Sequence, residues 1–113
     1  DIIITLETKE LLAVTKRASL CAVDRGGSIK FALKKGSLHI SAASQNQEFS
    51  EDLSVDYKGD EFQVAFNPQF VMDALKHVDT EKMTIGLTTP VNPALLEPVG
   101  GGDYRFVIMP MRI

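Results

Sequence analysis

Apolar and polar residues follow two different periods along this chain, and each period predicts one kind of element. The β-branched run Ile2–Glu7 has the composition of a strand, and Thr8 stands where a helix N-cap belongs. Helical spacing then continues to about Val23, and Gly26-Gly27 breaks it. The chain is therefore expected to open with a strand that leads directly into a helix.

Turn residues divide the next part of the chain into strands. The expected strands are Ser28–Leu33, Ser37–Ala43, Glu48–Tyr57 and Phe62–Phe66. Lys35-Gly36 forms a tight turn after the first of them, and Lys58-Gly59-Asp60 forms the turn after the third. A second helix follows, capped by Asn67, with Pro68 at its first position, where the missing N–H of proline costs nothing.

The order of elements occurs twice. Three last strands are expected at Lys82–Leu87, Ala94–Glu97 and Tyr104–Met109. Each half then reads strand, helix, three strands, and an offset of about 59 residues places Thr8 on Asn67 and Arg17 on Lys76. Because each helix has one apolar stripe that only a sheet can cover, the pattern predicts an α+β fold with both helices on one face of a continuous antiparallel sheet.

Helical spacing separates a core face from an outer face on both helices. The core positions are Leu11, Val14, Thr15, Ala18 and Ala22 on the first helix, and Val71, Ala74, Leu75 and Val78 on the second. The outer positions are Lys9, Ala13, Lys16, Arg17 and Leu20, then Gln69, Asp73, Lys76 and His77, with Phe70 at the boundary. Lysines on an outer helix face usually do no more than contact water. Leu20 does not fit this interpretation, because it is an apolar residue on the same polar face.

Composition limits the classes of protein to consider. The 113 residues suffice for one domain, and the start without methionine inside an apolar run suggests a fragment. No apolar stretch approaches the roughly 20 residues of a membrane span, so a cytoplasmic domain without membrane contact is expected. Cys21 is the only cysteine, which excludes an internal disulfide, and the net charge of −3 argues against a general nucleic-acid binder.

Catalytic interpretations find little support. His39 lies in an alternating strand and His77 on an outer helix face, and their spacing matches neither a metal pair nor a nucleophile relay. Gly100-Gly101-Gly102 opens no helix and precedes no lysine, so it is expected to be a loop instead of a phosphate-binding turn. No metal and no cofactor are expected, and an enzyme is the least favoured hypothesis.

The C-terminus is apolar almost to its last residue. Chain ends are usually polar and frayed, so the run Val107–Ile113 is expected to dock against another part of the protein. Pro110 lacks a backbone donor and ends the last strand, which leaves Met111, Arg112 and Ile113 beyond it. Methionine is typical of adaptable binding surfaces. A terminal strand that is simply tucked into the core remains the alternative.

Four segments also resemble a known family. They are the helix Lys9–Leu20, the segments Phe66–Leu75 and Asn92–Pro98, and the terminal Tyr104–Ile113, in which Met109-Pro110-Met111-Arg112 is the most specific. Over essentially the whole chain, the sequence resembles the C-terminal third of the bacterial DNA sliding clamp, the beta subunit of DNA polymerase III. The resemblance implies that residues 1–113 are one domain of DNA-clamp fold, the third in a head-to-tail ring that encircles duplex DNA. It also implies a non-catalytic processivity factor that binds peptides of the polymerase and the clamp loader.

The resemblance assigns three sets of residues. The peptide-binding set is Asn67, Phe70, Val91, Pro93, Val107, Met109, Pro110, Met111 and Arg112. The subunit-interface set is Leu20, Cys21, Glu48, Glu51 and Asp52, and the DNA-facing set is Lys16, Arg17 and Lys76. Phe70 departs from the family, which usually has tyrosine there, so a hydrogen bond from that hydroxyl is in doubt. A stand-alone peptide-binding module is the alternative, and the upstream sequence would distinguish the two.

Overall fold

The computed structural model describes residues 2–21, 28–43, 48–89, 91–100 and 105–111. Their elements are β1 (Ile2–Glu7), α1 (Thr8–Cys21), β2 (Ile29–Lys34), β3 (Ser37–Ala43), β4 (Glu48–Ser54), β5 (Phe62–Phe66), α2 (Pro68–Leu75), β6 (Lys82–Leu87), β7 (Ala94–Pro98) and β8 (Phe106–Ile108). The predicted order is confirmed, and β1, β3, β5 and β6 have the predicted bounds. The expected break at Gly26-Gly27 lies outside the described residues.

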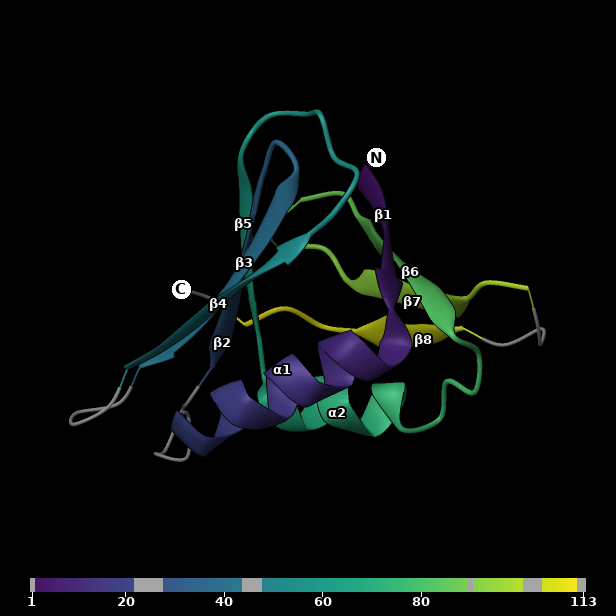
Figure 1. The fold of residues 1–113 in the computed structure, drawn as a ribbon, viewed down its shortest axis with the longest axis horizontal. Helices are drawn as coiled ribbons and strands as arrows, with labels where there is room; N and C mark the ends of the chain where they lie inside the picture. The colour runs from purple at the N-terminus through teal and green to yellow at the C-terminus, as the bar shows by residue number, and fades with distance from the viewer. Residues whose placement is uncertain (1, 22–27, 44–47, 90, 101–104, 112–113) are drawn as a thin grey trace.

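The strands form two antiparallel sheets of four strands, which corrects the expectation of one continuous sheet. The first sheet has the order β1-β6-β7-β8, and the second has the order β4-β3-β2-β5. Figure 1 shows the two sheets at an angle to each other, with α1 and α2 side by side along one side of both. The predicted α+β class and the placement of both helices on the same side are therefore confirmed.

The division into two sheets follows from an exchange of strands between the two halves of the repeat. β1 pairs along its whole length with β6 of the second half, from Ile2↔Leu87 to Glu7↔Lys82. β5, which precedes α2, pairs with β2 of the first half. Each sheet thus holds three consecutive strands of one half and the leading strand of the other, so neither half can form its sheet alone.

The two helices begin differently, although the repeat aligns Thr8 with Asn67. The Asn67 side chain accepts a 2.9 Å hydrogen bond from the Gln69 N–H, and Pro68 occupies the first turn, as predicted. The prediction for Thr8 is wrong, because α1 already includes this residue. Its hydroxyl is buried with no hydrogen-bond partner among the described residues, and its backbone N–H donates a 2.9 Å hydrogen bond to the Glu81 carbonyl.

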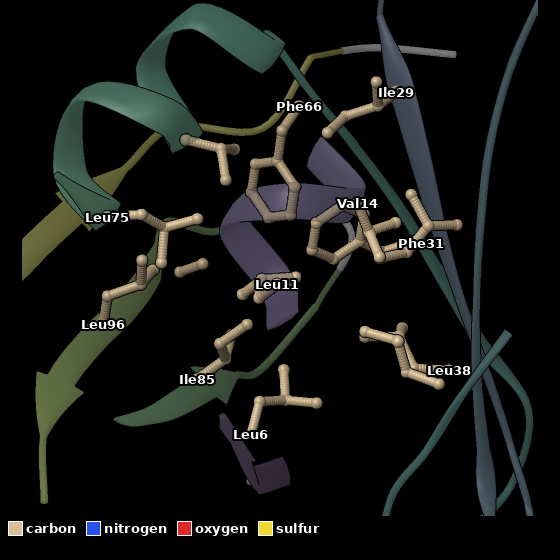
Figure 2. Packing of buried hydrophobic residues seen from close by; sticks show 14 of the residues in the cluster. Leu6, Leu11, Val14, Ile29, Phe31, Leu38, Phe66, Leu75, Ile85 and Leu96 are labelled. Carbon is tan, nitrogen blue, oxygen red and sulfur yellow. The ribbon is translucent and has the colours of Figure 1, made fainter. Parts of the chain in front are cut away.

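One core lies between the helices and both sheets. In Figure 2, Leu11 and Val14 of α1 point toward Phe31 and Leu38 of the second sheet and toward Ile85 of the first. The core positions predicted on α1 and α2 are buried, apart from Ala22, which lies outside the described residues. Thr15 is fully buried because its hydroxyl donates a 2.8 Å hydrogen bond to the Leu11 carbonyl. The helices therefore keep only their outer faces for contacts with other molecules.

Candidate functional site

The C-terminal segment passes from the first sheet to the second. β8 forms an edge of the first sheet, where Ile108 is paired with Ala94 and buried. Beyond Pro110, the Met111 N–H donates a 2.7 Å hydrogen bond to the Ala65 carbonyl on β5, as an isolated antiparallel bridge. The predicted docking of the terminus is confirmed as far as Met111, and Arg112 lies outside the described residues.

Four large apolar side chains of the predicted peptide-binding set lie at the surface. Their exposed fractions are 57% for Phe70, 70% for Val91, and 59% each for Val107 and Met109. The alternative of a terminus tucked entirely into the core is therefore wrong for Val107 and Met109. In the described part of the chain, the other exposed large apolar side chains are Ile3, Leu20 and, at 43%, Val99. A concentration of exposed apolar residues marks an interaction surface on a soluble domain.

Backbone contacts bring the C-terminal segment to the junction of β5 and α2, where Phe70 lies. Met111 is bonded to Ala65, two residues before Asn67, and the Phe70 N–H donates a 3.1 Å hydrogen bond to the Asn67 carbonyl. The α2 helix meets β8, where the rings of His77 and Phe106 lie 6.0 Å apart between centroids. Extending the pairing Ala94↔Ile108 by one residue sets Pro93 beside Met109. We call the predicted peptide-binding residues Asn67, Phe70, Val91, Pro93, Val107, Met109, Pro110 and Met111 the terminal surface.

Asn67 and Phe70 give the terminal surface its polar and aromatic groups. The Asn67 side-chain oxygen caps α2, so its NH2 group is the part of the amide left for a partner. Phe70 is one helical turn further along, more than half exposed. Without a hydroxyl, its ring offers only apolar area, which suits an aliphatic or aromatic side chain of a ligand.

The predicted subunit-interface residues lie where the end of α1 meets β4. Leu20 is 71% exposed on α1, as its outer position predicted. Cys21, the next residue, has its thiol in the core of the domain, with 9% of its surface exposed. Glu48 and Asp52 are exposed on β4, and Glu51 is half-buried. The exposed apolar area of this surface therefore comes from Leu20, whereas Cys21 belongs to the core of the domain.

Two of the β4 carboxylates have partners within the domain. Arg17 Nη2 on α1 lies 2.6 Å from Glu51 Oε2, and His39 Nδ1 on β3 lies 2.7 Å from Asp52 Oδ1. β4 is also an edge strand, because it pairs with β3 and with no other described strand. An edge strand carries unpaired backbone groups that another strand can bind. Leu20 and the acidic side chains thus border a backbone edge that is able to extend the sheet.

The predicted DNA-facing cations are all exposed on the helix side of the domain. Lys16 and Arg17 lie on the outer face of α1, and Lys76 follows the last turn of α2. The two helices are in contact, so the three side chains belong to one helical layer. Lys16 and Lys76 form no ion pair with any described residue, whereas Arg17 is bound to Glu51. Ala13, predicted to face outward, is half-buried.

The histidines have structural partners. His77 Nδ1 lies 2.7 Å from the Asp73 carbonyl oxygen one turn earlier in α2, and His39 is paired with Asp52. Among the described residues, no group of three or more His, Cys, Asp or Glu side chains is placed to hold a metal ion. Nor is any described helix both long and apolar enough to cross a membrane.

An apolar strip on the outer face of the first sheet was not predicted from the sequence. Strand pairing aligns Ile3 with Gly86, Gly86 with Leu95, and Leu95 with Val107. Ile3 is 68% exposed, and a cavity of about 140 Å³ opens beside it, bounded by Gly86, Leu95 and Pro93 among others. The strip reaches the terminal surface at Val107 and Pro93. Its only signal in the sequence was the alternation that sets Ile3 opposite the buried Ile4.

Comparison with known proteins gives a consistent family. The family model for the C-terminal domain of the DNA polymerase III beta subunit matches residues 1–112. The beta sliding clamp of Chlamydia pneumoniae is 33% identical over 109 residues, which are 96% of this chain and 29% of that protein. The beta sliding clamp of Pseudomonas putida is 30% identical over 114 residues, covering 100% of this chain and 31% of that protein.

Solved structures agree with these sequence matches. The DNA polymerase sliding clamp of Pseudomonas aeruginosa superimposes with a TM-score of 0.94 at 25% identity, over 100% of this chain and 32% of that one. The DNA polymerase III beta subunit of Thermotoga maritima gives a TM-score of 0.91 at 27% identity, over 98% of this chain and 30% of that one. The chain thus spans about a third of the length of these relatives.

Proposed function

The chain belongs to the family formed by the C-terminal domain of the DNA polymerase III beta subunit, and on that premise we propose that it is the third domain of a ring around duplex DNA. The predicted family and its clamp fold are thereby confirmed. In the proposed ring the domain holds the polymerase on DNA through topology and performs no catalysis. The ring requires further domains, because this chain is about a third of its relatives' length. A cytoplasmic location suits Cys21, a free thiol buried in the core.

The terminal surface is the proposed binding site for short peptides of the polymerase and the clamp loader. The single observation that carries this proposal is the exposure of Phe70, Val91, Val107 and Met109 around the docked C-terminal segment. When an apolar peptide side chain binds, this exposed apolar area is removed from water. Each Å² removed contributes about 25 cal/mol to the binding free energy. The Asn67 NH2 group can orient the peptide through a backbone carbonyl. A stand-alone module is less favoured, because the family match covers nearly the whole chain.

The helical layer is proposed to face DNA. Helix side chains that point at a duplex can offer cations to phosphates in any register, which permits sliding. Lys16 and Lys76 are exposed and free of ion pairs among the described residues, and so are suited to this role. The domain as a whole is acidic, with a net charge of −3, so the attraction is expected to be weak and sensitive to salt.

Head-to-tail self-association is proposed through the unpaired edge of β4. A strand of a neighbouring protomer could extend the second sheet there, while Leu20 supplies an apolar contact beside it. The β4 edge is acidic because it carries Glu48, Glu51 and Asp52. A basic strand of the partner would therefore be complementary in charge. The combination of apolar anchor, acidic rim and free backbone supports an interface between protomers.

Peptide binding by the full-length protein tests the central proposal. A fluorescein-labelled peptide of the polymerase is titrated and its anisotropy is measured. Phe70→Ala is expected to weaken binding by roughly tenfold or more, because an aromatic anchor is lost from the middle of the surface. Val99→Ala is the matched control, since Val99 is also exposed but lies at the opposite end of β7 from Pro93. Equal affinities for the two variants would refute the assignment.

A further inference from the structure

The ion pair between Arg17 and Glu51 joins the two surfaces proposed above. Arg17 Nη2 and Glu51 Oε2 are 2.6 Å apart, although the residues are 34 positions apart in the chain. The exposed fractions of the two side chains are 51% and 36%, so both are partly withdrawn from water. The pair thus connects the outer face of α1 to the edge strand β4.

The position of Glu51 explains why this carboxylate needs a cation. Glu51 is the pairing partner of Ile40 on β3, and partners in an antiparallel sheet direct their side chains to the same face. Ile40 is fully buried beneath α1, and Leu53, two residues after Glu51, is buried on that same face. The Glu51 carboxylate therefore stands at the margin of the core, with 36% of its side chain exposed. The guanidinium of Arg17 is the charge partner that it has there.

Arg17 differs in this respect from the neighbouring cation. Lys16 is exposed on the same helix and has no acidic partner among the described residues. A phosphate that binds Lys16 displaces only water and counterions. A phosphate that binds Arg17 must compete with the Glu51 carboxylate for the same guanidinium. The first contact is therefore favourable at low salt, whereas the second is opposed by the protein itself.

We infer that the Glu51 carboxylate occupies the guanidinium of Arg17 and so prevents it from binding DNA. While the carboxylate is present, this cation does not bind phosphate. The inference rests on the proposed function, because it assumes that the helical layer faces the duplex. Within that layer it assigns different roles to adjacent residues: Lys16 contacts phosphate, and Arg17 is a positioning residue for the edge strand. Removal of the Glu51 charge is therefore a gain of function for DNA binding.

The salt dependence of DNA binding by the full-length protein tests this inference. Anisotropy of a labelled duplex is measured over a series of NaCl concentrations, and the slope of log K against log salt counts the phosphates neutralised. Each neutralised phosphate contributes about 0.9 to the slope. Lys16→Gln is expected to lower the slope by about this amount, and Arg17→Gln is expected to leave it unchanged. Glu51→Gln is expected to raise the slope by about 0.9 and to increase affinity at low salt.

Two further variants separate the release of Arg17 from a general loss of negative charge. Asp56→Asn removes an exposed carboxylate two residues beyond the same strand but does not free Arg17, so the slope should remain that of the wild type. Arg17→Gln combined with Glu51→Gln should cancel the gain of the single Glu51 variant. Circular dichroism and sedimentation establish that each variant is folded and assembled before binding is measured.

The outcomes distinguish failure of the inference from failure of the proposed function. If Arg17→Gln lowers the slope as much as Lys16→Gln does, Arg17 binds phosphate directly and the inference is overturned. A gain from Asp56→Asn equal to that from Glu51→Gln also overturns it. If Lys16→Gln has no effect, the helical layer does not contact DNA, and the inference falls together with the proposed orientation.

Discussion

The backbone N–H of Met111 donates a 2.7 Å hydrogen bond to the carbonyl of Ala65. This contact links the segment that follows β8 in the first sheet to β5 in the second sheet. Because β5 leads directly into Asn67 and α2, the same contact holds the C-terminal segment beside Phe70. In Figure 1 this segment, in yellow, leaves β8 and crosses toward the second sheet. The terminal surface thus depends on an interaction between two sheets.

Replacing Met111 with proline should damage both the fold and the terminal surface. Proline has no N–H, so the hydrogen bond to Ala65 is lost, at a cost of about 1 kcal/mol of unfolding free energy. Peptide affinity should fall as well, since the segment is no longer held beside α2. Met111→Ala retains the N–H and controls for the side chain. Urea unfolding and peptide anisotropy measure the two effects, and equal stability of the two variants would contradict the role of the hydrogen bond.

The two helix starts should respond differently to loss of their polar side chains. Asn67→Ala removes the cap of α2 and should lower the unfolding free energy by about 1 kcal/mol, whereas Asn67→Asp retains an acceptor and should cost less. Thr8→Val replaces a buried hydroxyl, which has no hydrogen-bond partner among the described residues, with a methyl group of similar size, so stability should be unchanged or increased. Thermal unfolding measures both. A large loss in Thr8→Val would show that the hydroxyl has a partner.

Leu20→Asp should leave the domain stable and weaken assembly. Because Leu20 is 71% exposed, the substitution should change the unfolding free energy by less than about 0.5 kcal/mol. Leu11→Ala, in the fully buried core, is the contrasting variant and should cost about 2–5 kcal/mol. Sedimentation of the full-length protein should show dissociation for Leu20→Asp alone. Intact assembly in this variant would remove Leu20 from the proposed interface.

The chain of 113 residues by itself should bind duplex DNA weakly or not at all. Its net charge is −3, and a single domain cannot encircle the duplex. Anisotropy of a short labelled duplex at moderate salt measures the affinity. A dissociation constant below about 1 μM would mean that the domain binds DNA directly. The contact with DNA would then not depend on the ring.

Local patterns in the sequence were sufficient to locate most elements and to orient the helices. Asn67 followed by Pro68 marks the start of α2 because a cap and a proline act within a single helical turn. The burial of Leu11, Val14, Thr15 and Ala18 follows from helical period alone, and the exposure of Lys16 and Leu20 follows with it. Specific segments such as Met109-Pro110-Met111-Arg112 also indicated the family, which is confirmed.

Tertiary structure decided which of these elements became neighbours. Alternation shows that one face of β1 is buried, but it is equally compatible with a partner in either half of the repeat, and only packing selects β6. The capping side chain expected at Thr8 was buried without a partner, and Arg17 found Glu51, which is 34 residues away. Sequence periods report which face of an element avoids water, because that depends on the residue itself. The partner that covers the face depends on the whole chain, since distant elements must fill one core together.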